Sequence, residues 1–444
     1  MKKLCILFLV SLIFLASCAA GGNDVSKTDV SQNGISQSDV SQGGESSQTV
    51  SVDHGESLLA RGDLMQFVSA KNVDGKQIDE VFRRSQMRLA MELFASCAQE
   101  SEGKNVLISP LSIQVALAMT ANGASGQTLE EMQALLGGDI PLDELNAYLY
   151  EYVNTLPSSD KYKVELANSI WFREQSGFEV YESFLQTNAD YYKSQAYAAP
   201  FDDTTVEQIN KWVDVHTDGM IKEVVDEIDP LTMMYLINAL VFDAEWAVPY
   251  DEYSVHDGTF TALGGKACDV EYMSAEEGYY LETKDAVGFA KNYKDGKYRF
   301  VTLLPDEGVD VYDYIASLDG ETMLNALDNM ERTSVLATMP KFSYEYDLEM
   351  KDVLKSLGMP TAFTDGADFS AMSNHDLHIG AVIHKTFIEV AEKGTRAGAV
   401  TSVGMMEECA PMYQAVIKLD RPFVYLIIDT ETNLPLFVGT VAEF

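Results

Sequence analysis

The chain has 444 residues, of which 46% are hydrophobic and 23% are charged. This composition is typical of a globular protein with a large core, and it excludes disorder throughout the chain. The formal net charge is -38, from 69 acidic and 31 basic residues, so the surface repels polyanions and argues against nucleic acid as a partner.

The N-terminus predicts export. Two lysines after Met1 precede the apolar run Leu4–Phe14, which is too short to span a membrane and has the length of a signal peptide. The run ends in Leu-Ala-Ser-Cys18, which resembles the bacterial lipobox, so we expect a lipoprotein signal peptide over residues 1–17 and lipidation of Cys18. The alternative is a plain secretory signal with a chance cysteine. Either form places the protein outside the cell, and the lipidated form would be anchored at the outer face of the bacterial cell membrane or at the cell surface, reaching the extracellular space if shed.

Residues 18–57 are rich in Ser, Gly, Gln and Asp and contain a near-repeat of Asp-Val-Ser-Gln. This composition predicts a flexible tether that holds the folded part away from the membrane, although an unselected spacer would look the same. Beyond Cys18 the cysteines occur only at positions 97, 268 and 409. Their wide spacing predicts neither a disulfide framework nor a metal site.

Residues 58–444 read as one large folded domain, because helical and strand patterns alternate without a second linker. The apolar residues between Gln77 and Ala98 recur at helical spacing and predict a helix with one buried face. In the next segment Ser109 is a candidate N-cap, Pro110 suits the first turn, and Asn122-Gly123 is a stop signal. Thr128 and Glu131 then form a candidate capping box for a further helix.

Several motifs, in this order along the chain, resemble those of the serpins, a family of protease inhibitors. They are Asn105–Ile113, Asn122–Ala124, Thr128–Met132, Ile209–Val213, Leu236–Trp246, Met339–Phe342, Leu357–Met359, Ala367–Ser370, Arg421–Ile428 and Pro435–Val441. The resemblance implies an α+β fold, with several helices packed around a large central β-sheet plus smaller sheets. It also implies an exposed reactive loop that a protease cleaves and whose N-terminal part then inserts into the central sheet, so we expect an inhibitor and not an enzyme.

The segment Ile388–Cys409 corresponds to this loop and its hinge, and Glu392-Lys-Gly394-Thr395 matches the inhibitory hinge pattern. A segment that becomes a buried strand needs small side chains on the face that turns inward, and strand side chains alternate with period two. The inward set is small throughout: Thr395, Ala397, Ala399 and Thr401. Arg396 falls in the other set, with Gly398, Val400 and Ser402. Arg396 and Gly398 depart from an all-alanine hinge, which favours slower insertion and simple cleavage.

Two counts place the cleaved bond differently. Counting forward from Gly394 by the family's usual interval gives Glu408-Cys409, which suits glutamyl endopeptidases, granzyme-like serine proteases or caspase-like cysteine proteases. Counting backward from Arg421 lands near Pro411-Met412, so the loop is longer than the common pattern. We favour Glu408-Cys409, because the inserted length governs trapping. Met405 and Met406 are the alternative, since they suit elastase-like and chymotrypsin-like proteases.

Five residues match the positions at which serpin sheets part to admit the loop. The polar members are Ser109, Ser112, Asn238 and His384, and Trp246 matches an aromatic residue near the top of the opening. Each has a plainer reading alone, because serines at a helix start are caps and a histidine in a strand is usually a hydrogen-bonded core group. Together they predict a latch that closes two strands and re-forms after insertion.

Two rival functions remain open. One is a non-inhibitory serpin that acts as a protease substrate, a binding module or a chaperone. The other is a surface hydrolase, which the absence of HExxH, GxSxG and Walker motifs disfavours. We expect a monomer without cofactor or metal, and its partner is the target endopeptidase. Its only contact with the membrane is the lipid anchor. The acidic net charge argues against heparin as a ligand.

Overall fold

The computed structural model describes residues 49–51, 62–396 and 413–444. All of them belong to one compact unit, Ser47–Phe444. The predicted residues Cys18, Ala397, Gly398, Ala399, Met405, Met406, Glu408 and Cys409 lie outside the described ranges. Within those ranges, no helix has both the length and the apolar character needed to cross a bilayer.

The first long helix has the buried face that its sequence predicts. Asp79 caps it by accepting a hydrogen bond from the Phe82 backbone N–H, and the buried side chains include Phe82, Leu89 and Phe94. Val81, which the apolar pattern placed on the buried face, is 60% exposed. The α-helices are α1 (Glu80–Glu100), α2 (Pro110–Ala121), α3 (Gly126–Gly137), α4 (Leu142–Thr155), α5 (Glu182–Tyr192), α6 (Asp203–His216), α7 (Val311–Ser317), α8 (Gly320–Asp328) and α9 (Lys351–Ser356).

Two predicted helix starts have different outcomes. Ser109 caps α2, and its side chain accepts a hydrogen bond from the Ser112 backbone N–H. The capping box at Thr128 is wrong, because α3 already begins at Gly126. The Thr128 hydroxyl accepts instead from the Asp368 N–H at 2.9 Å, and Glu131 accepts from the Thr361 backbone and hydroxyl. Both side chains therefore bond to residues distant in sequence and not to each other's backbone, as a capping box would require.

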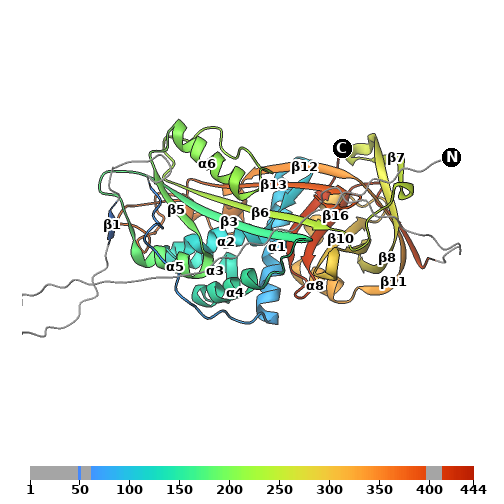
Figure 1. The fold of residues 1–444 in the computed structure, drawn as a ribbon, viewed down its shortest axis with the longest axis horizontal. Coiled ribbons are helices and arrows are strands. Elements are labelled where there is room, and N and C mark those ends of the chain that lie inside the picture. The colour runs from blue at the N-terminus through green and yellow to red at the C-terminus, as the bar shows by residue number, and fades with distance from the viewer. Residues whose placement is uncertain (1–48, 52–61, 397–412) are drawn as a thin grey trace, which may run out of the picture. The chain divides into compact units, whose positions relative to one another are not determined.

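A six-stranded sheet has helix α6 on one side and helix α2 on the other (Figure 1). Its strands in spatial order are β12 (Phe342–Glu349), β13 (Ala381–Ala391), β14 (Gly394–Thr395), β6 (Met234–Glu245), β3 (Tyr162–Arg173) and β5 (Gln195–Ala199). Helix α6 covers one face, where Ile209 and Trp212 share an apolar cluster with Tyr235 of β6. Helix α2 covers the other face and is buried on all sides.

A second sheet of nine strands contains the predicted terminal hairpin, β16 (Phe423–Asp429) paired with β17 (Pro435–Val441). Its other strands are β15 (Ala415–Lys418), β11 (Glu331–Pro340), β8 (Ala267–Thr283), β9 (Ala286–Asn292), β10 (Tyr298–Pro305), β2 (Val106–Ile108) and β7 (Val255–Thr261). Short 3₁₀ turns lie at Glu252–Ser254, Leu263–Gly265, Lys294–Gly296 and Thr361–Phe363. One continuous apolar core joins this sheet to α1 and α2.

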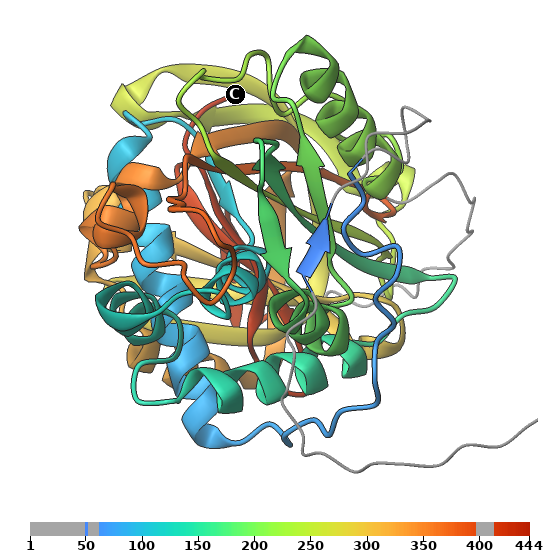
Figure 2. The same cartoon turned by 90° about the vertical axis from the view of Figure 1, so that its left-hand side faces the viewer.

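The segment before α1 runs along the edge of the six-stranded sheet, as the view from that end shows (Figure 2). Leu64 donates its N–H to the Ala196 carbonyl at 2.9 Å, and Ala198 donates to the Gly62 carbonyl at 2.8 Å. Strand β1 (Thr49–Ser51) pairs antiparallel with β4 (Glu179–Tyr181). The two hydrogen bonds that join Leu64 to Ala196 and Ala198 to Gly62 cover part of the β5 edge, which would otherwise present free backbone groups.

Candidate functional site

The predicted hinge residues Gly394 and Thr395 form β14, a two-residue strand between β13 and β6. Thr395 pairs with Val390 of β13 on one side and with Ala244 of β6 on the other. At the opposite end of the sheet, residues 381–384 of β13 pair directly with residues 235–238 of β6 as parallel strands. The two strands are thus joined at one end and separated at the other by the first residues of the loop.

Trp246 holds the turn that precedes β14. Its indole Nε1 donates to the Ala391 carbonyl at 2.8 Å, and its backbone N–H donates to the Lys393 carbonyl at 2.8 Å. The indole is fully buried and stacks on Tyr293 with ring centroids 4.4 Å apart. The Tyr293 hydroxyl lies 2.5 Å from the Thr395 hydroxyl, so this aromatic pair touches the hinge on both sides of the turn.

Glu392 is tied down by an ion pair. Its Oε1 lies 2.5 Å from Lys341 Nζ, which also lies 3.1 Å from a carboxylate oxygen of Glu271. Burial acts to raise the pKa of Glu392, but the hydrogen bond and charge of Lys341 outweigh it, so the pKa is lowered. The first predicted hinge residue is therefore ionised and anchored to Lys341, the residue that joins β11 to β12.

The four polar residues predicted to form a latch lie together in the core. His384 Nε2 accepts from the Ser109 N–H at 3.1 Å, and His384 Nδ1 lies 2.9 Å from Asn238 Oδ1. Ser112 donates its hydroxyl to the same Asn238 oxygen at 3.0 Å. All four side chains are at most 3% exposed. The cluster joins α2 to the two strands at the point where they still pair directly.

The hydrogen bonds also define the state of the His384 ring. Because Nε2 accepts from a backbone N–H, the proton is on Nδ1, which donates to Asn238. Burial lowers the pKa of His384 from 6.5 to about 3, since a charged imidazole would lose its hydration. The ring is neutral at physiological pH, and it completes the hydrogen bonding of a region that excludes water.

Trp246 does not contact the other four predicted residues. It follows the last residue of β6, eight residues beyond Asn238, which is roughly 26 Å along an extended strand. The boundary between β13 and β6, called the seam below, therefore has two separate sites. The polar cluster lies where the two strands pair directly. The aromatic clamp, formed by Trp246 and Tyr293, lies where β14 separates them.

Three residues at this seam were not identified from the sequence as site residues: Tyr293, Lys341 and Tyr250. The Tyr250 N–H donates to the Glu392 carbonyl at 2.8 Å. Lys341 belongs to the Met339–Phe342 motif, which was the only available signal. Tyr293 contacts a residue 102 positions away, and nothing in its local sequence indicates that partner.

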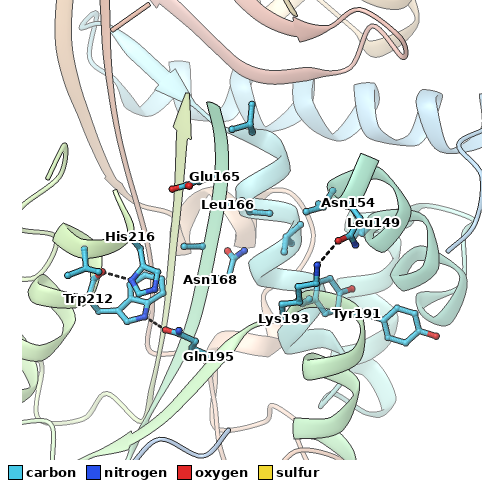
Figure 3. Close-up of a pocket in the computed structure, with 16 residues that line it drawn as sticks. Leu149, Asn154, Glu165, Leu166, Asn168, Tyr191, Lys193, Gln195, Trp212 and His216 are labelled. Atoms are coloured by element: carbon cyan, nitrogen blue, oxygen red, sulfur yellow. Dashed lines mark hydrogen bonds between the residues drawn. The ribbon is translucent and has the colours of Figure 1, made fainter. Parts of the chain in front are cut away.

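A separate cavity of about 470 Å³ lies between α4, α5, α6 and β3 (Figure 3). Trp212 and His216 line one side, and Lys193, hydrogen-bonded to Asn154 at 2.7 Å, lines the other. The carboxamide oxygen of Asn168 is buried there without a hydrogen-bond partner among the described residues. None of the predicted hinge or latch residues that the structure describes lines this cavity. Elsewhere in the described ranges, no group of three or more His, Cys, Asp or Glu side chains is placed to hold a metal ion.

Comparison with known proteins places this geometry in a family. The family model for serpins (serine protease inhibitors) matches residues 84–444. An uncharacterised serpin-like protein of Thermococcus kodakarensis is 33% identical over 347 residues, which cover 76% of this chain and 80% of that protein. The crystal structure of the thermophilic serpin tengpin in its native state is 46% identical, with a TM-score of 0.83, and covers 86% of this chain and 99% of that chain.

Tengpin in its latent state is also similar, at 47% identity with a TM-score of 0.74, covering 83% of this chain and all of that chain. The chain is thus closer in fold to the native state than to the latent state of the same relative. Members of this family are generally protease inhibitors rather than enzymes, which makes a target protease the expected partner. From its motifs, its fold and these relatives together, the chain belongs to the serpin family.

Proposed function

We propose that this protein is a single-use inhibitor that traps an endopeptidase by inserting its cleaved loop between β13 and β6. The observation that carries the proposal is the position of β14. Its two residues already pair with both strands, so the next loop residues can continue an existing antiparallel register. Insertion then extends a strand that has begun and does not need a new site.

The energetics favour insertion after cleavage. Thr395 to Glu408 would form a strand of 14 residues, and at about 3.3 Å per residue its far end would move roughly 45 Å. About ten new backbone hydrogen bonds at roughly 1 kcal/mol each, with added apolar burial, supply on the order of 10 kcal/mol. This is comparable to the whole stability of an ordinary domain.

This movement explains inhibition if it occurs while the protease is still bound as an acyl-enzyme. The protease would be carried across the sheet and pressed against the inhibitor. A small displacement of its oxyanion hole or its attacking water would remove most of the catalysis of deacylation, because both depend on sub-ångström positioning. The covalent complex would then persist.

The cleaved bond decides which proteases are trapped. Glu408-Cys409 lies outside the described residues and remains our preferred bond, with Met405 and Met406 as alternatives. A glutamate requires a basic primary pocket, whereas a methionine suits the apolar pockets of elastase-like and chymotrypsin-like enzymes. The inhibited class is therefore an endopeptidase of the serine type, or of the cysteine type if it is caspase-like.

The direct test mixes the purified protein with elastase, chymotrypsin, a glutamyl endopeptidase and a granzyme-like protease in separate reactions. We expect an adduct that survives denaturing electrophoresis and a released C-terminal fragment, which mass spectrometry would show to begin at Cys409. A fragment beginning at Met406 or Glu407 would move the bond and keep the mechanism. Cleavage by every enzyme without any adduct would favour a non-inhibitory serpin.

A hinge variant tests the mechanism itself. Thr395 is 3% exposed and faces Tyr293, so Thr395→Arg would place a guanidinium inside the sheet and should convert the inhibitor into a substrate. Thr261→Arg is the matched control, because Thr261 is an exposed threonine on the edge strand β7. The control should retain adduct formation, and equal behaviour of the two variants would contradict insertion at Thr395.

We further propose that the protein is exported and anchored by a lipid on Cys18, with residues 18–57 as the tether. The support is the signal-like N-terminus and the lipobox-like Leu-Ala-Ser-Cys. Expression in a bacterial host with a labelled fatty acid tests this. We expect label in the membrane fraction of the wild type and none in Cys18→Ala, and an unlabelled, secreted wild type would indicate a plain signal peptide.

A further inference from the structure

Arg396 occupies the point where the loop leaves the sheet. Its backbone N–H still donates to the Glu389 carbonyl of β13 at 2.9 Å, which continues the pairing of Thr395 by one residue. Its φ is +52°, however, which is the left-handed region that a side chain with a Cβ seldom adopts. The strand therefore stops at Arg396 because of a backbone conformation that is unfavourable for arginine.

The register defines the position that Arg396 would take in an extended strand. Because Gly394 pairs with Glu245 and Thr395 with Ala244, the next residue lies opposite Asp243 of β6. On the other side, the pairing of Thr395 with Val390 places it opposite Glu389 of β13. An extended Arg396 would thus have an acidic residue beside it on both neighbouring strands.

The charges near Arg396 already favour this position. The positive charge of its guanidinium acts to lower the pKa of the carboxyl groups of Asp243 on β6 and Asp218 after α6. Burial raises the pKa of Asp243, and the charges of Arg396 and Lys163 oppose that rise. Lys163, which lies opposite Asp243 on β3, is already engaged with Asp218 and Glu165. Asp243 therefore has no close ion-pair partner among the described residues, and Arg396 is a nearby cation.

The guanidinium is incompletely paired in this state. Its Nη1 atom is buried and has no hydrogen-bond partner among the described residues, although the side chain as a whole is only partly buried. A buried donor without an acceptor is costly. Arg396 thus combines an unfavourable backbone conformation with an unsatisfied donor, and an extended conformation beside Asp243 would relieve both.

We propose that Arg396 is a positioning residue that drives the first step of loop insertion, by changing from its left-handed conformation to an extended one in which it pairs with Asp243. This inference rests on the proposed function and reverses our expectation from the sequence, in which Arg396 slows insertion. The sequence shows a charge in a segment that must enter a sheet. The structure adds the acidic residues on the outer face of that sheet, which make the charge favourable.

The test is a charge swap. Arg396→Glu, Asp243→Lys and the double variant would be titrated against a protease that forms an adduct with the wild type, and the moles of inhibitor consumed per mole of protease trapped would be measured. Cross-strand ion pairs and like-charge contacts predict that each single variant needs about threefold to fivefold more inhibitor than the wild type. The double variant should recover part of this loss, because the restored ion pair is offset by the like charges of Glu389 on β13 and Lys163 on β3.

The controls separate charge from folding. Arg84→Glu makes the same charge change on the exposed face of α1, far from the hinge in sequence and next to Glu80, and should leave the stoichiometry unchanged. The defect of Arg396→Glu should shrink in 1 M NaCl, because that salt concentration screens charges over about 3 Å. A misfolded variant would show neither this salt effect nor rescue by Asp243→Lys.

A second measurement keeps the inference testable if the wild type traps no protease. Cutting the loop with a nonspecific protease and following the gain in thermal stability with time reports insertion without an adduct. An absent adduct would reject the proposed function, whereas slower insertion in Arg396→Glu that the charge swap restores would still support the role of Arg396. The role is overturned if Arg396→Glu inserts as fast as Arg84→Glu, if it inserts faster than the wild type, or if the double variant is as impaired as the singles.

Discussion

His384 makes the stability of the latch depend on pH. The ring accepts from the Ser109 N–H and donates to Asn238, and a protonated ring could not accept. Its pKa is 6.5 when exposed and about 3 in the fold. Because the folded pKa is the lower one, the contribution is complete above pH 6.5 and is lost as the pH falls toward 3.

We therefore predict that the free energy of unfolding falls by about 2 kcal/mol between pH 7 and pH 5 because of this one residue. In His384→Asn the same pH change should cost about 2 kcal/mol less than in the wild type, whatever the stability of the variant at pH 7. Denaturant unfolding at the two pH values measures this difference. An equal loss of unfolding free energy between pH 7 and pH 5 in the two proteins would show that His384 is not the titrating group.

Lys291 and Glu277 form a buried ion pair below the aromatic clamp. Their charged atoms are 2.6 Å apart, and the two residues are only 2% and 8% exposed. Lys291 Nζ also lies 4.2 Å from the ring centroid of Tyr250, whose backbone holds the hinge turn. Burial raises the pKa of Glu277, and Lys291 opposes this shift. The pair is therefore sensitive to the loss of either partner.

We predict that Lys291→Met lowers the free energy of unfolding by about 3 to 5 kcal/mol, because it leaves the Glu277 carboxylate buried without a counter-charge. The double variant Lys291→Met, Glu277→Leu should recover most of this loss. Lys355→Met, which removes an exposed pair with Asp352, should cost less than about 1 kcal/mol. A double variant as unstable as Lys291→Met would show that packing, and not the isolated charge, causes the loss.

The hinge hairpin is the element on which the proposed function depends. The turn from β13 to β14 is held by backbone bonds to Trp246 and Tyr250 and by the pair of Glu392 with Lys341. These contacts are directional, so they place Gly394 and Thr395 in register between two strands. They also show why the hinge begins in the sheet before any cleavage.

At this scale we predict that Glu392→Gln lowers the free energy of unfolding at pH 7 by about 0.5 to 1 kcal/mol, a modest value because both side chains are partly exposed. The pKa of Glu392 is below its ordinary 4.5 in the fold, so the contribution is present above pH 4.5 and disappears as the pH falls through the lowered value. Glu307→Gln, at an exposed position, is the control. A difference between the variant and the wild type that persisted at pH 2 would contradict an ionic role.

Across the whole molecule, the excess of acidic over basic residues is the dominant electrostatic feature. The net charge of -38 produces self-repulsion that salt would screen, whereas the surface ion pairs that salt weakens contribute little each. We predict that raising NaCl from 10 mM to 200 mM increases Tm by about 2 °C or more. KCl should have the same effect, since screening does not depend on the cation. A fall in Tm would mean that the ion pairs outweigh the net repulsion.

Local features were predicted well where the interaction partners are near in sequence. The Ser109 cap needs only a residue three positions on, and the helix predicted between Gln77 and Ala98 follows from apolar spacing within that one segment. The Thr128 capping box failed for the complementary reason, because Asp368 and Thr361 lie more than 200 positions away in sequence. The α+β fold and the family followed from motifs in order, which spread the inference over most of the chain.

The sequence by itself determined the composition of the predicted hinge, the small side chains of its predicted inward set and the choice of the four polar residues that cluster between α2 and the two strands, because each of these depends on residue type and on the order of motifs. Only the tertiary structure decided that β14 already lies in the sheet, that Trp246 is separate from the four polar residues, and that the position after Thr395 in the register of β14 lies opposite Asp243. These facts depend on which strands become neighbours and in which register, and pairings between residues 100 or more positions apart leave no local pattern. A charged residue can hinder or favour strand insertion, depending on the charges of the neighbouring strands. The role of Arg396 could therefore be inferred only from the fold.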